Sequence, residues 1–143
     1  IVLSKGEPSS EAYPKKYGDV TVYDWIDDLT QFELLKACDL LVCRAGHGIV
    51  TKALIYGKPL VLIPIPDQTE QYGNAYRAVR LGVAEVITQS ELNEEKLLKA
   101  IERILISDVY EKRARHVADM TATLDATQTA IEVVKQLAQR SYA

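Results

Sequence analysis

The chain has 143 residues, which is enough for about one domain. Hydrophobic residues make up 48% of the sequence and charged residues 26%, as is typical of a globular domain. The net charge of -3 lacks the basic excess of nucleic-acid-binding proteins, and no apolar run reaches the roughly 20 residues of a membrane helix.

The two cysteines and two histidines exclude further classes of protein. Cys38 and Cys43 are too few for a disulfide framework, and their spacing suits no common metal site. We expect both to be small buried residues of a cytoplasmic protein. His47 and His116 lie far apart in the sequence, so no structural zinc site is expected.

The first part of the chain is predicted to form two strands and a short helix. Strands are expected over residues 1–3 and 20–23, with a polar loop over 4–18 between them. Thr30 and Glu33 resemble a capping box and predict a helix that ends near residue 37.

From residue 40 onward, strands alternate with helices. The expected strands span 40–43, 60–63 and 84–87, and the expected helices span 48–56, 69–81, 93–105, 109–120 and 125–138. Strands that alternate with helices predict an α/β fold with a doubly wound, parallel, Rossmann-like sheet and additional C-terminal helices.

A glycine turn follows the strand predicted over 40–43. That strand is apolar without alternation, as expected when both faces are covered, and Gly46 and Gly48 come directly after it. Gly57 and Pro59 predict the end of the helix that follows. The free amides and the dipole at the start of such a helix favour phosphate, although glycine turns in α/β proteins also occur without any ligand.

A second polar loop follows the strand predicted over 60–63. Asp67 and Gln68 lie beyond the carboxyl end of that strand, after two prolines. Ligands of open parallel sheets bind at this edge. An edge with helix amides, a carboxylate and an amide suits an anionic ligand rich in hydroxyls, such as a nucleotide sugar. The same dipeptide is also compatible with ordinary turn chemistry.

The run from Cys38 to Val86 resembles the C-terminal, donor-binding domain of glycosyltransferases of the GT-B fold. It is most similar to the bacterial enzymes that add N-acetylglucosamine to undecaprenyl-diphosphate-linked muramyl-pentapeptide, and to other UDP-sugar transferases. The resemblance rests on the strand and turn at 38–46, Gly57-Lys58-Pro59, Pro64 with Asp67-Gln68, and the continuation at 71–75.

The resemblance implies a role for each matching residue. Arg44 corresponds to a basic residue that faces the donor phosphates and assists catalysis. Asp67 and Gln68 correspond to a pair that bonds the sugar hydroxyls, and Gln71 and Asn74 to polar positions near the sugar. The amides of Gly46, His47, Gly48 and Ile49 are expected at the diphosphate, and Trp25, Ile26 and Lys52 at the base and ribose.

Several of these residues also have an ordinary structural interpretation. Arg44 can form a surface salt bridge, and Trp25 can pack in a core. Lys52 departs from the family pattern, because relatives carry a glutamate there that accepts hydrogen bonds from the ribose hydroxyls. Lysine has three donors and no acceptor, so Lys52 leaves the nucleotide and the ribose contact open.

The resemblance also implies what surrounds this chain. The family's domain opens with one more strand and helix, and a separate N-terminal domain grips the acceptor and supplies the catalytic base. We therefore expect residues 1–143 to be a single, truncated donor-binding domain that is inactive alone. We expect a UDP-linked hexose or N-acetylhexosamine as donor, no metal or cofactor, and a cytoplasmic location, with peripheral membrane association through the missing part.

Two alternatives remain open at this stage. The chain can be a non-catalytic or split subunit that needs a partner chain, docked through the apolar face around Val133 and Leu137 of the last helix. That face can equally pack on its own domain. The chain can also belong to an enzyme similar to UDP-N-acetylglucosamine 2-epimerase on the same fold, although the residues around Ala45 and Lys52 match that pattern less well.

Overall fold

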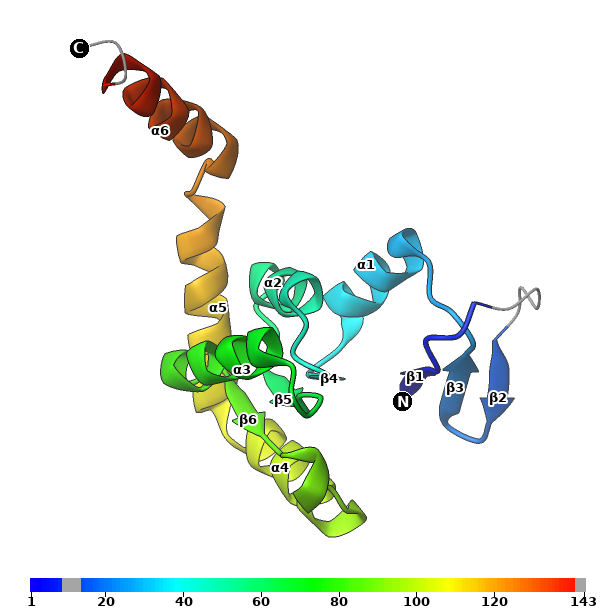
Figure 1. Ribbon diagram of the computed structural model, residues 1–143. Coiled ribbons are helices and arrows are strands. Elements are labelled where there is room, and N and C mark those ends of the chain that lie inside the picture. The colour runs from blue at the N-terminus through cyan, green and yellow to red at the C-terminus, as the bar shows by residue number, and fades with distance from the viewer. Residues whose placement is uncertain (9–13, 141–143) are drawn as a thin grey trace. The chain divides into compact units, whose positions relative to one another are not determined.

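The computed structural model describes residues 1–8 and 14–140. The chain divides into two compact units, Ile1–Cys38 and Asp39–Ala143, which are considered separately (Figure 1). The prediction that residues 1–143 form a single domain stays a prediction.

The first unit contains a three-stranded sheet of order β1-β3-β2. Strands β1 (Val2–Ser4) and β3 (Val20–Tyr23) run parallel, and β2 (Lys15–Tyr17) pairs with β3 in the antiparallel sense. The predicted loop over 4–18 was therefore wrong at β2, and its residues 9–13 lie outside the described residues. Strand β2 is exposed and carries two lysines, so it lacks an apolar pattern, but Gly18-Asp19 between the strands was a usable hairpin signal.

Helix α1 (Asp28–Ala37) completes the first unit. The expected capping box was wrong, because Asp27 rather than Thr30 is the N-cap. The Asp27 carboxylate accepts hydrogen bonds from the Thr30 amide at 3.0 Å and from the Thr30 hydroxyl at 2.6 Å. Asp27, three residues before Thr30, thus satisfies the free amide at the helix start that the predicted cap was expected to satisfy.

The second unit is built on a parallel sheet of order β4-β5-β6, which confirms the predicted Rossmann-like fold. The strands are β4 (Leu41–Cys43), β5 (Leu60–Leu62) and β6 (Ala84–Val86). All three residues of the central strand β5 are fully buried. Both of its faces are therefore covered. The prediction that the strand over 40–43 is covered on both faces was wrong, because Val42 of β4 is 39% exposed.

Helices on both faces bury this sheet. Helix α2 (His47–Ile55) connects β4 to β5, and α3 (Thr69–Leu81) connects β5 to β6. Because right-handed crossovers between successive neighbours lie on one side, α2 and α3 share a face of the sheet. Helix α4 (Glu94–Ile106) packs on the other face, where Val61, Ile87, Ala100 and Ile104 form a buried cluster.

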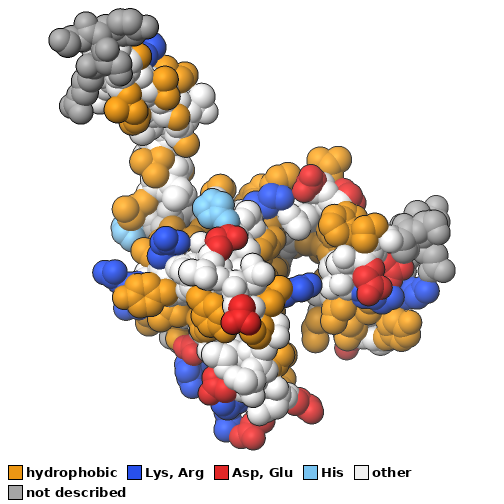
Figure 2. All heavy atoms as spheres, viewed as in Figure 1, with side chains coloured by type: hydrophobic (Ala, Val, Ile, Leu, Met, Phe, Trp, Pro, Cys, Tyr) orange, Lys and Arg blue, Asp and Glu red, His pale blue; other side chains and the backbone are white. Residues whose placement is uncertain are grey.

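The C-terminal helices are α5 (Asp108–Ala122) and α6 (Ala126–Arg140). Helix α5 packs against α2 and α4. Along α6, hydrophobic side chains lie on the visible surface (Figure 2), and Val133 and Leu137 are 50% and 57% exposed. Burial of that face on its own domain is therefore not observed in the described chain.

Candidate functional site

The two loops singled out by the sequence lie at the same edge of the second sheet. Strands β4 and β5 are parallel neighbours, with Cys43 opposite Leu62, and the Ile63 amide donates to the Cys43 carbonyl at 2.8 Å. The loop before α2 and the loop before α3 thus leave adjacent carboxyl ends. This is the edge at which parallel α/β sheets bind ligands.

Gly46 and Gly48 at the start of α2 are not required by the fold. Gly46 has φ -62°, neither glycine has a positive φ, and a Cβ added at either position would meet no atom within 4 Å. Gly57 and Gly82 differ, because both have positive φ and both lie close to an arginine of α5. The glycines at 46 and 48 therefore keep the outside of the helix start open, which permits close approach of a ligand to the backbone.

The turn before α2 is strained, and a side chain of α3 stabilises it. Ala45 is fully buried and has φ 60°, a left-handed conformation that non-glycine residues rarely adopt. The side chain of Asn74, only 7% exposed, donates from Nδ2 to the Ala45 carbonyl at 3.0 Å. Arg77 donates in turn to Asn74 Oδ1 at 3.2 Å. Asn74 therefore positions the turn between strand and helix.

Glu70 is part of this site and was missed by the sequence analysis. Its Oε1 accepts a hydrogen bond from the His47 amide at 3.0 Å and another from Asn74 Nδ2 at 3.0 Å. Helix α2 has no acid in its first turn and no side-chain cap, so an acid from α3 takes that role. The usable signal was the position of Glu70 in the first turn of α3, where the helix dipole stabilises acidic side chains.

The amides of Gly48 and Ile49 remain without a protein acceptor among the described residues. The Val50 amide, by contrast, donates to the Gly46 carbonyl at 3.1 Å and starts the regular helix. The helix start thus offers two unsatisfied donors and a third that Glu70 occupies.

The loop after β5 is shaped by Gln71. Its Oε1 accepts a hydrogen bond from the Ile65 amide at 2.9 Å, which ties the loop to α3. Asp67 is exposed and has φ 63°, and the exposed Gln68 is the N-cap of α3. A second non-glycine residue in a strained conformation thus borders the same edge.

The structure gives fewer contacts for the other predicted site residues. Arg44 follows β4, is exposed, and forms no ion pair in the described part of the chain, so the salt-bridge alternative is not observed. Lys52 lies partly buried on α2. Trp25 and Ile26 belong to the first unit, and Trp25 is 57% exposed rather than packed in a core. The assigned ligand roles stay predictions.

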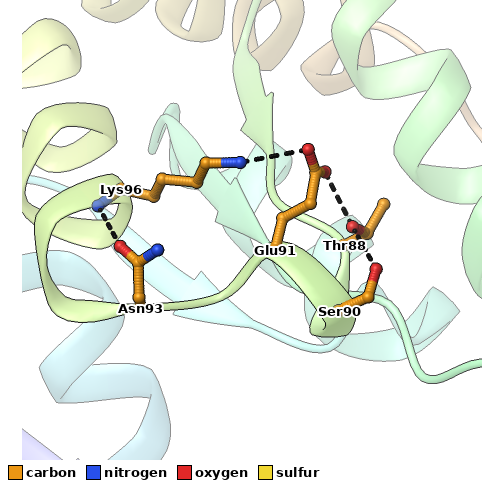
Figure 3. A network of polar contacts seen from close by, with 5 residues as sticks. All are labelled: Thr88, Ser90, Glu91, Asn93 and Lys96. Carbon is orange, nitrogen blue, oxygen red and sulfur yellow. Dashed lines mark hydrogen bonds and ion pairs between the residues drawn. The ribbon is translucent and has the colours of Figure 1, made fainter.

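The carboxyl end of β6 is occupied by a polar network that starts α4 (Figure 3). The Thr88 hydroxyl donates to Glu91 at 2.7 Å, Lys96 pairs with Glu91 at 3.1 Å, and the Lys96 amide donates to Asn93 at 2.9 Å. The Thr88 hydroxyl first, and then Lys96, lower the pKa of Glu91. These groups satisfy one another, which leaves the ends of β4 and β5 as the candidate site.

Cys38 and Cys43 are both free, and both are partly buried rather than fully buried. Burial raises the pKa of the Cys43 thiol, which favours its protonated form. Among residues 1–8 and 14–140, no group of three potential His, Cys, Asp or Glu ligands comes together around a metal position. No helix in that same part of the chain is both long and apolar enough to cross a membrane.

Comparison with known proteins gives the site a family context. Residues 2–137 match the family model described as the glycosyltransferase family 28 C-terminal domain. The chain is 27% identical over 147 aligned positions to the UDP-N-acetylglucosamine–N-acetylmuramyl-(pentapeptide) pyrophosphoryl-undecaprenol N-acetylglucosamine transferase of Lactobacillus delbrueckii subsp. bulgaricus, covering 99% of the chain and 40% of that protein. It is 31% identical over 142 positions to the protein of the same name from Bacillus cytotoxicus, covering 98% of the chain and 36% of that protein.

Solved structures support the fold. The glycotransferase of kitacinnamycin has a TM-score of 0.76 at 22% identity and matches 94% of this chain and 34% of its own. Glycosyltransferase VinC, solved in complex with dTDP, has a TM-score of 0.74 at 22% identity over 88% of this chain and 31% of its own.

The sequence match and the fold therefore agree. The chain spans about two fifths or less of the curated relatives named above. Its family match extends over nearly all of its residues, from the first sheet through most of α6. The chain belongs to the family of glycosyltransferase family 28 C-terminal domains.

Proposed function

We propose that this chain binds the nucleotide-sugar donor of a glycosyltransferase that transfers a hexose or N-acetylhexosamine, with a UDP-sugar as the preferred donor. The observation that carries the proposal is the open surface above Gly46 and Gly48, at a helix start with unsatisfied amides. The UDP preference is supported by the bacterial relatives whose names specify UDP-N-acetylglucosamine.

The proposed chemistry is displacement at the anomeric carbon. A bond forms from an acceptor hydroxyl oxygen to that carbon, and the bond from the carbon to the donor's phosphate oxygen breaks. The nucleoside diphosphate leaves with the bonding electron pair, and the hydroxyl proton passes to a base. Amides at Gly48 and Ile49 and the guanidinium of Arg44 stabilise the negative charge that develops on the leaving group.

The remaining parts of the site select the sugar and complete the enzyme. Asp67 and Gln68 offer acceptors and donors to sugar hydroxyls from the neighbouring loop. Lys52 of α2 donates to a ribose or phosphate oxygen of the donor. Because the relatives extend well beyond the matched region, we propose that the acceptor site and the base lie in the rest of the protein.

Gly48→Ala tests this proposal. The added methyl meets nothing in the chain and alanine favours a helix by about 1 kcal/mol over glycine, so the fold is kept. A diphosphate seated on the adjacent amides meets the methyl directly. We expect at least tenfold weaker binding of UDP-N-acetylglucosamine in calorimetric titration of the full-length protein.

Gly73→Ala on α3 is the matched control, since its methyl makes only an ordinary 3.7 Å contact with the end of the Arg77 side chain. It should bind the donor as the wild type does. A panel of UDP-, GDP- and dTDP-sugars measured in the same way identifies the nucleotide. Unchanged donor binding in Gly48→Ala would remove the start of α2 from the site.

A further inference from the structure

Glu70 occupies a position in which it opposes the ligand of the proposed site. Its carboxylate accepts from the amide of His47, the first amide of α2, at 3.0 Å. The same oxygen accepts from Asn74 Nδ2 at 3.0 Å. Without a ligand, the start of the helix is therefore neutralised by the chain's own anion rather than by water.

We propose, building on the proposed function, that Glu70 is an internal competitor of the donor diphosphate and sets the affinity for the nucleotide. A diphosphate oxygen that takes the His47 amide must replace the Glu70 oxygen, because two anions cannot share one donor without strong repulsion. Binding thus requires the carboxylate to leave.

The structure allows this exchange without damage to the turn. Glu70 is an exposed residue, so its carboxylate can rotate into water. Asn74 keeps its bonds to the Ala45 carbonyl and to Arg77 when Glu70 departs. The strained turn is therefore supported in both states, and only the contact between Glu70 and the helix start is exchanged.

This arrangement lowers the affinity for every ligand that uses the His47 amide. The donor and the nucleoside diphosphate product both belong to that group, so the return of Glu70 to the amide assists product release. A nucleoside without phosphates does not reach the amide and is unaffected. Glu70 accordingly acts as a residue that tunes phosphate affinity and does not itself take part in the reaction.

The test compares Glu70→Gln with the wild-type full-length protein. Glutamine keeps an oxygen that can accept from His47 and Asn74, so the fold is preserved while the charge is removed. We expect UDP and inorganic pyrophosphate to bind on the order of fivefold more tightly, the scale of a carboxylate at a helix start, with uridine unchanged. Glu95→Gln on α4 removes the same charge from an exposed residue paired with Lys99 and should change none of these affinities.

The possible results are distinct. Tighter binding of UDP and pyrophosphate by Glu70→Gln, but not by Glu95→Gln, supports the inference. Equal or weaker UDP binding by Glu70→Gln, with the wild type still binding UDP, overturns it and leaves the proposed function standing. If the wild type binds no nucleoside diphosphate at all, both the proposed function and the inference fail. Loss of the charge should also shift the His47 amide signal in NMR spectra without ligand, which checks the contact independently of binding.

Discussion

Removing the Asn74 side chain is the sharpest test of how the candidate site is held. In Asn74→Ala, the carbonyl of the fully buried Ala45 loses the Nδ2 donor that lies 3.0 Å away. A buried carbonyl without a partner costs about 1–3 kcal/mol. Glu70 and Arg77 also lose a bond, but both are exposed and recover it with water at little cost.

The expected loss in the free energy of unfolding is therefore about 2 kcal/mol, measured by urea denaturation followed by circular dichroism. Asn93→Ala is the comparison, since it removes a side-chain bond of 2.9 Å at an exposed helix cap and should cost about 1 kcal/mol. The reasoning is refuted if Asn74→Ala costs no more than Asn93→Ala, because the buried carbonyl would then have another partner.

Two further predictions concern stability. Gly57→Ala should destabilise the protein by about 2–3 kcal/mol and Gly82→Ala by about 1–2 kcal/mol. Both have positive φ, but the methyl at 57 meets the backbone Cα of Arg115 at 3.2 Å while the one at 82 meets a flexible arginine end; equal losses in denaturant titrations would contradict this difference. Bonds from the Thr30 hydroxyl, and then from its amide, lower the pKa of Asp27. The stability that Asp27 contributes is present above its unfolded pKa and is lost as pH falls through its folded pKa. Lowering the pH from 6 to about 3 should therefore reduce the free energy of unfolding more in the wild type than in Asp27→Asn. Parallel profiles of unfolding free energy against pH would contradict this prediction.

Local signals in the sequence were sufficient for most of the elements. The unbroken apolar runs predicted β4 and β5, and Gly57 predicted the end of α2. Helix α4 begins where the sequence predicted, with Asn93 as its N-cap, and the Asn93 side chain accepts a hydrogen bond from the Lys96 amide. These features depend on backbone sterics and on groups within one helical turn, so the order of residues determines them directly.

The errors arose where two local solutions competed or where the pattern was polar. Asp27 and Thr30 both suit a helix cap, and only the folded geometry selected Asp27. Strand β2 has no buried face, so its pairing with β3 depends on the neighbouring strand rather than on its own composition.

The sequence by itself determined which residues lead to the candidate site, because parallel strands place their following loops at one edge. The sequence also pointed to the turn at Gly46 and Gly48. The tertiary structure then showed that the space above both glycines is open and that neither has a positive φ. Only the tertiary structure decided that Asn74 holds the Ala45 turn and that Glu70 occupies the His47 amide. Those contacts join residues 29 and 23 positions apart, and their formation depends on how α3 packs beside α2, which no local pattern specifies.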